Sequence, residues 1–134
     1  MNRSTARENA FLLLFERACK SDEDAKDIFS KAVEYRDIKT DGYVEGVFFG
    51  VNENIGAISD VINKNLVGWR KERVSKVSEA ILNLSVYEMM FLSDVPVKAS
   101  INEAVKLSKK YDDEKAYKFI NGVLNAVAEA LGKK

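Results

Sequence analysis

Residues 75–92 constrain the fold more than any other stretch, because apolar side chains cover almost the whole circumference of the helix that they predict. A surface helix is apolar on one face only, whereas a helix that is apolar all round lies inside the protein. The apolar residues of this stretch are Val77, Ala80, Ile81, Leu82, Leu84, Val86, Tyr87, Met89, Met90, Phe91 and Leu92. We therefore expect this helix to be the central one, with other helices packed around it.

Glu88 is the charged residue on the Val77-Ile81-Leu84-Phe91 face of that helix. Burial of a carboxylate is costly unless the charge is paired and hydrogen-bonded. Glu88 is therefore either paired inside the protein or exposed at a contact site, and the sequence leaves both alternatives open.

Apolar residues elsewhere in the chain also recur at the 3.6-residue spacing of helices, and no run alternates as a strand would. Asp94-Val95-Pro96 ends the central helix, because the residue before a proline avoids the α conformation. Further helices are expected at 5–20, 24–35, 40–65, 100–111 and 114–131, of which the third is long and possibly bent, and a short turn at 69–73. The prediction is an all-α fold of six or seven helices that forms one compact domain over residues 1–134.

Two sequence patterns predict where helices begin. Thr5 followed by Glu8, and Ser100 followed by Glu103, both fit the capping box, in which a hydroxyl and a carboxylate three residues apart satisfy free backbone N–H groups. Ser21 to Asp24 is expected to form the loop and the cap before the helix at 24–35.

Glycines recur in two predicted helices, where each costs about 1 kcal/mol relative to alanine. Gly42, Gly46 and Gly50 are spaced by four residues, and Gly122 follows Asn121 in the last helix. We expect the row at 42–50, and Gly122 beside the apolar stripe of its helix, to allow another helix of the same domain to approach closely.

Composition excludes several classes of function. The 134 residues include no histidine and a single cysteine, Cys19, so a zinc site or a Cys-His nucleophile is nearly untenable. The sequence has no P-loop, and Asp112-Asp113-Glu114 is expected to open a helix rather than to bind a metal. We therefore expect a protein that is not an enzyme and that uses no cofactor.

The net charge of the chain identifies no partner, whereas its cysteine usage indicates a cellular compartment. There are 21 basic and 21 acidic residues, so the net charge of zero points to no particular ligand. A lone cysteine fits a reducing compartment, and neither a signal peptide nor a membrane span is recognisable. The expected location is the cytoplasm.

Several short motifs in the second half of the chain coincide with one family. They are Tyr87-Glu88, Asp94-Val95-Pro96, Ile101-Asn102-Glu103-Ala104-Val105, and Lys118-Phe119 with Asn121-Gly122-Val123-Leu124, preceded at the N-terminus by Ala6-Arg7-Glu8. In this order and spacing the chain resembles the NusB family of bacterial transcription antitermination factors. The resemblance implies a fold of two packed three-helix bundles. It also implies binding of single-stranded boxA RNA together with NusE, in an RNA polymerase antitermination complex on ribosomal RNA operons.

The resemblance also implies roles for particular residues. Arg3 and Arg7 correspond to the basic N-terminal segment that contacts RNA in the family. Glu88 and Phe119 correspond to positions where the family meets NusE. Both pairs are therefore candidate binding residues.

The residues themselves leave alternatives open. Phe119 lies off the centre of its apolar stripe, so its ring is either peripheral core or an exposed anchor. The basic stretch from Trp69 to Lys76 either contacts RNA or is a lid on the core surrounded by solvated charges. The alternative function is that of a protein-interaction module or homodimer that uses the glycine row at 42–50 or Phe119.

Overall fold

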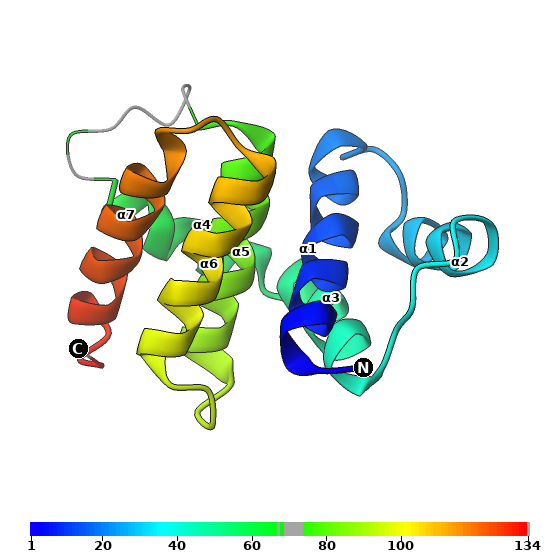
Figure 1. Ribbon diagram of the computed structural model, residues 1–134, viewed down its shortest axis with the longest axis horizontal. Helices are drawn as coiled ribbons and strands as arrows, with labels where there is room; N and C mark the ends of the chain where they lie inside the picture. The colour runs from blue at the N-terminus through cyan, green and yellow to red at the C-terminus, as the bar shows by residue number, and fades with distance from the viewer. Residues whose placement is uncertain (67, 69–73, 134) are drawn as a thin grey trace.

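The computed structural model describes residues 1–66, 68 and 74–133 of the chain. Within these residues the chain forms seven α-helices and no strand, which confirms the predicted fold class. The helices are α1 (Arg3–Cys19), α2 (Ala25–Tyr35), α3 (Gly42–Glu53), α4 (Ile55–Lys64), α5 (Lys76–Phe91), α6 (Val97–Tyr111) and α7 (Ala116–Ala130). Figure 1 shows α1, α2 and α3 on one side of the molecule and α5, α6 and α7, with α4 beside them, on the other. The predicted turn at 69–73 lies outside the described residues.

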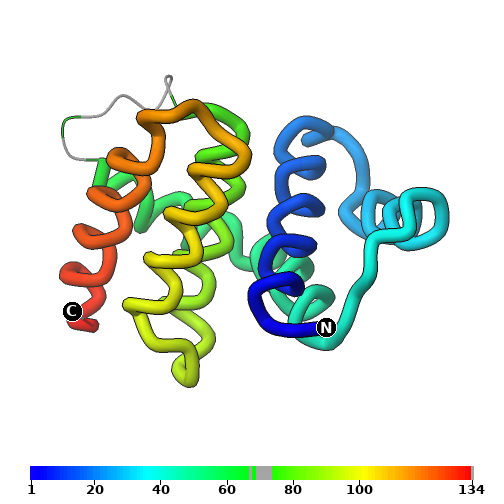
Figure 2. Tube along the Cα trace, viewed as in Figure 1, coloured from blue at the N-terminus to red at the C-terminus, as the bar shows by residue number. Residues whose placement is uncertain are grey.

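The predicted central helix is α5, which belongs to the second group, where Figure 2 shows it behind α6, and which also contacts the first group. It packs against α1 and α3 of the first group and against α4, α6 and α7 of the second. Most of its apolar side chains are buried, among them Ile81, Leu82 and Leu84, whereas Phe91 at its last residue is 44% exposed. Burial of each such side chain stabilises the fold by about 1.5–3 kcal/mol. Because these side chains contact helices of both groups, α5 joins the two groups into one core.

The expected single helix at 40–65 is two helices, α3 and α4, which meet at Asn54. The Asn54 side chain donates to the carbonyl of Gly50 at 2.8 Å, and its φ of −114° ends the α conformation. Asparagine competes for backbone groups in this way, and therefore favours helix ends. The apolar stripe nevertheless continues across the break, because both Val51 and Ile58 are buried.

Two helices begin earlier than their predicted capping boxes. Asn2 caps α1, since its Oδ1 accepts from the backbone N–H of Thr5 at 2.8 Å, and Pro96 occupies the cap position of α6. The hydroxyl of Ser100 instead donates to Glu88 from inside α6. The caps at Asp24 and Ser75 agree with the predicted starts of α2 and α5.

Close packing explains only one of the singled-out glycines. A Cβ added at Gly50 would collide with the ring of Tyr87, so this position confirms a close helix contact. Gly42, Gly46 and Gly122 are exposed, and a Cβ added at any of them would meet nothing. The prediction for Gly122 was wrong because the residue lies about 200° round the helix from Ile120, on the side that faces solvent.

Candidate nucleic-acid interface

The N-terminus of α1 presents an ordered positive charge. Arg3 lies in the first turn of α1 and is exposed, and its guanidinium carbon is 4.2 Å from the centre of the Tyr43 ring in the first turn of α3. A cation over an aromatic ring is stabilised by about 0.5–1 kcal/mol at an exposed site. This contact orders a side chain that would otherwise rotate freely, at the end of the helix where the dipole already favours an anion.

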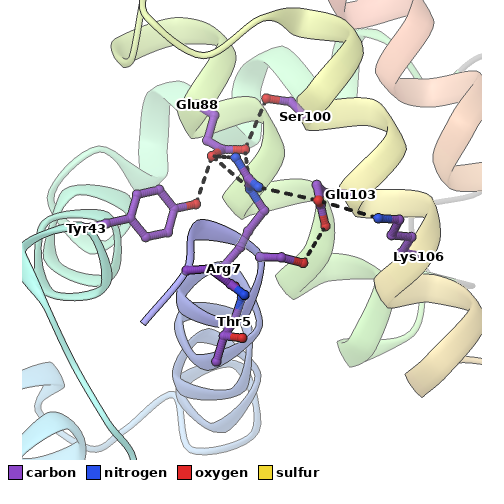
Figure 3. A network of polar contacts seen from close by, with 9 residues as sticks. Thr5, Arg7, Tyr43, Glu88, Ser100, Glu103 and Lys106 are labelled. Atoms are coloured by element: carbon purple, nitrogen blue, oxygen red, sulfur yellow. Dashed lines mark hydrogen bonds and ion pairs between the residues drawn. The ribbon is translucent and has the colours of Figure 1, made fainter.

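Tyr43 is held in place by a buried ion pair between Arg7 and Glu88 (Figure 3). The Arg7 guanidinium donates to Glu88 Oε2 from Nε at 3.1 Å and from Nη2 at 2.9 Å. The Tyr43 hydroxyl donates to the same oxygen at 2.8 Å, and the Ser100 hydroxyl donates to Oε1 at 3.1 Å. These contacts join α1, α3, α5 and α6 through a single carboxylate.

The electrostatics of this cluster raise the pKa values of Arg7 and Tyr43. Burial by itself would lower the pKa of Arg7, but the hydrogen bond and the charge of Glu88 together raise it. Burial also raises the pKa of Tyr43, and the negative charge of Glu88 raises it further. The tyrosine hydroxyl therefore remains a donor at any physiological pH. A buried pair of this kind tolerates its desolvation because every charged group has partners.

A second cluster links α1 to α6 at the surface. The carboxylate of Glu8 accepts from Lys110 Nζ at 2.5 Å and from the Tyr111 hydroxyl at 2.6 Å. These two hydrogen bonds lower the pKa of Glu8. They add a second polar contact between α1 and the second group of helices.

Other kinds of site are not evident in the part of the chain that the structure describes. There, no three His, Cys, Asp or Glu side chains are grouped as a metal site requires. None of the described helices has the length and apolar character needed to cross a membrane.

Comparison with known proteins assigns this architecture. The model of the NusB family matches residues 4–129. The transcription antitermination protein NusB of Bacillus pumilus is 41% identical over 131 residues, which cover 98% of this chain and 98% of that protein. The chain belongs to the NusB family.

Solved NusB structures have the same fold. The T. maritima NusB structure superposes with a TM-score of 0.83 at 30% identity, covering 96% of this chain and 92% of that chain. A chain from the crystal structure of antitermination factors NusB and NusE in complex with dsRNA superposes with a TM-score of 0.84 at 34% identity, covering 96% of both. The predicted resemblance to the NusB family is thus confirmed.

In this NusB-family chain the two arginines assigned to RNA have different environments. Arg3 is exposed at the start of α1, whereas Arg7 is only 5% exposed and its guanidinium is engaged with Glu88. Arg7 thus holds Glu88, whose carboxylate also accepts from the Tyr43 hydroxyl. The RNA-binding role of Arg7 stays a prediction.

The two residues assigned to NusE are both buried. Glu88 has no exposed surface, so of its two alternatives the structure shows the one in which it is paired inside the protein. Phe119 is 7% exposed and lies at the edge of the core, beside the exposed Lys118. Direct contact of either side chain with NusE stays a prediction.

Sequence reasoning missed Tyr43, Ser100 and Glu103 as members of this cluster. Tyr43 lies at the edge of the buried stripe of α3, four residues before Val47, but no local pattern identifies its partner on α5. The Ser100-Glu103 pair was interpreted as a capping box, although both side chains point toward α1 and α5. Only the packing of α6 against α1 and α5 distinguishes the two interpretations.

Proposed function

We propose that this protein is a transcription antitermination factor that binds single-stranded boxA RNA together with NusE. Its membership of the NusB family carries the proposal, supported by the likeness to a NusB chain in a complex with NusE and RNA. It acts in the cytoplasm, as part of the RNA polymerase elongation complex on ribosomal RNA operons. It works by binding and makes or breaks no covalent bond.

The start of α1 supports this proposal because it offers what single-stranded RNA requires. Single strands are bound by basic side chains along the backbone and by flat surfaces on which bases or cations stack. Arg3 supplies the charge, Tyr43 fixes its position, and the helix N-terminus adds a favourable dipole. The buried Arg7–Glu88 pair holds Tyr43, and through it Arg3, in position before RNA binds.

The overall charge of the chain explains why a second protein is needed. A net charge of zero gives little general attraction for a polyanion, so the isolated protein binds RNA weakly and with strong dependence on salt. NusE adds contacts to the same RNA and raises the affinity of the pair. On this account the single domain of residues 1–134 is one half of a composite RNA-binding surface.

Fluorescence titration of labelled boxA RNA, with and without NusE, tests the proposal. We expect NusE to increase the affinity, and Arg3→Ala to weaken binding by several-fold in both settings, because the substitution removes the ordered cation that meets a phosphate. Lys31→Ala is the matched control, since Lys31 is an exposed cation on α2, on the far side of the molecule from α6. Equal binding with and without NusE would contradict the proposal.

Self-association is the alternative that the same preparation can test. Exposed Gly42 and Gly46 on α3 leave space for close approach of a second copy. We expect sedimentation equilibrium to show a monomer that forms a one-to-one complex with NusE. A tight homodimer that excludes NusE would favour the interaction-module function instead.

A further inference from the structure

A groove of about 770 Å³ lies between α6 and α7. Its charged lining consists of Lys106 and Lys109 from α6, Lys118 from α7, and a single acid, Glu103. The excess of positive charge is local, since the whole chain is neutral. A concave basic surface on a neutral protein concentrates the electrostatic potential at one place, and so favours a polyanion there.

The lysines in the groove are available to a ligand. Lys118 is exposed, and none of the ion pairs in the described structure involves it. Lys106 makes only a long contact of 3.7 Å to Glu103, and its side chain is 71% exposed. Lys109 lies over the Tyr117 ring, with Nζ 4.7 Å from the ring centre. These contacts are weak enough to be exchanged for phosphate oxygens.

The rest of the lining fits nucleotides better than a protein. Tyr117 supplies an aromatic ring at the wall, and Asn102 and Asn121 supply amide groups that both donate and accept hydrogen bonds. Aromatic rings stack on bases of any sequence, and amides bond to base edges. Lysine, by contrast, is depleted from the centres of protein–protein interfaces.

The groove is continuous with the start of α1. Glu103 lines the groove, and it also accepts from the Ser4 hydroxyl at 3.3 Å, next to Arg3 in the first turn of α1. Figure 3 shows Glu103 between the buried Arg7 and the outward-pointing Lys106. A strand that contacts Arg3 therefore reaches the groove by passing along one face of α6.

We propose that the α6–α7 groove is a second RNA subsite, which holds the part of the strand that continues beyond Arg3. Lys106, Lys109 and Lys118 contact successive phosphates, and Tyr117 stacks on a base. The inference rests on the proposed RNA-binding function and extends it from the start of α1 to the face where α6 and α7 meet. It also implies that the bound RNA spans two helix pairs rather than the α1 terminus alone.

Salt dependence of RNA affinity is the first test, with the NusE complex and a labelled single-stranded boxA RNA as the probe. Each phosphate of a single strand that a lysine no longer neutralises reduces the slope of log K against log salt by roughly 0.7. We expect Lys109→Gln with Lys118→Gln to reduce the slope by roughly 1.4, and the affinity at about 0.1 M salt by roughly ten-fold or more. The charge-matched control is Lys26→Gln with Lys31→Gln on α2, which has the same net charge but should bind as the wild type does.

Stacking is tested separately from charge. Tyr117→Leu should weaken binding by roughly five-fold or more, whereas Tyr117→Phe, which retains the ring, should bind nearly as the wild type does. Circular dichroism melts of both variants check that the fold is intact. Equally weakened binding in the Leu and Phe variants, or wild-type binding in both, would overturn the stacking assignment.

These experiments distinguish a failure of the groove assignment from a failure of the proposed RNA-binding function. If Arg3→Ala weakens RNA binding while the groove variants keep wild-type affinity and slope, RNA binding stands and the groove assignment is wrong. If the groove variants fail to bind NusE in the absence of RNA, and bind RNA as the wild type does when NusE is absent, the groove is a protein surface. If the wild-type complex binds no RNA, the proposed function and the subsite both fail.

Discussion

Neighbouring residues of α1 form two polar clusters with different environments. Arg7 turns inward to Glu88, whose carboxylate has no exposure, and Glu8 turns outward to Lys110 and Tyr111. Both clusters tie the first group of helices to the second, and both combine a carboxylate, a cation and a tyrosine hydroxyl. The contrast shows what burial does to the same set of chemical groups.

The buried cluster is the one that specifies the position of α1. Charges taken out of water interact strongly and tolerate little displacement, so removing one partner leaves the other buried and uncompensated. The surface cluster is screened by water and salt, so its geometry is replaceable. Because Tyr43 belongs to the buried cluster and contacts Arg3, the rigid pair also determines where the exposed positive charge lies.

Removal of the buried carboxylate should have the largest effect. Glu88→Ala leaves the buried Arg7 guanidinium with the long 3.9 Å contact to Glu103 as its remaining ion pair in the described structure, and should lower the free energy of unfolding by about 3–5 kcal/mol. Urea denaturation followed by circular dichroism measures it. Glu88→Gln, which keeps the size and one acceptor, should be destabilised less. A destabilisation in Glu88→Ala no greater than that of a surface substitution would contradict the assignment of α1 positioning to this pair.

Tyr43→Phe should have a smaller effect that separates stability from RNA binding. It removes one hydrogen bond to a buried carboxylate, which contributes about 1.5–3 kcal/mol, but retains the ring beneath Arg3. We expect reduced stability in urea with nearly unchanged RNA affinity. Tyr43→Leu, which also removes the ring, should reduce both. If Tyr43→Phe binds RNA as poorly as Arg3→Ala, the hydroxyl rather than the ring orders Arg3.

Periodicity predicted most of the fold because it reports which side chains are buried. The all-round apolar pattern of residues 75–92 identified α5 as the central helix, and the spacing elsewhere identified the remaining helices, with α3 and α4 predicted as one. Helix ends were less predictable, since one or two hydrogen bonds decide them. Asn2 and Asn54 each end or begin a helix through a single side-chain amide, and neither interrupts an apolar stripe.

The candidate site was only partly predictable for a different reason. Arg7 and Glu88 are 81 positions apart, and each was assigned to a different binding surface before the fold placed them in contact. Glu88 was recognised as a residue needing a partner, but no local pattern identifies which of 21 basic residues provides it. The groove between α6 and α7 likewise exists only where two helices meet.

The surface cluster should show the smallest effect, and pH makes it measurable. The hydrogen bonds from Lys110 and Tyr111 lower the pKa of Glu8 in the folded protein, so the ionised carboxylate stabilises the fold. That contribution is complete above the pKa of the unfolded chain and is lost as the pH falls through the lowered folded pKa. Glu8→Gln should therefore be slightly less stable than the wild type at neutral pH, and the difference should vanish in acid.

The salt dependence of stability distinguishes the surface cluster from the buried one. The small deficit of Glu8→Gln should shrink in high salt, because water and ions reach the cluster, whereas the deficit of Glu88→Ala should persist there. Urea midpoints of the two variants and the wild type, measured at neutral and acidic pH and at low and high salt, give both differences. A Glu8→Gln deficit that resists both acid and salt would show that the surface cluster also positions α1, and the distinction between the two clusters would then disappear.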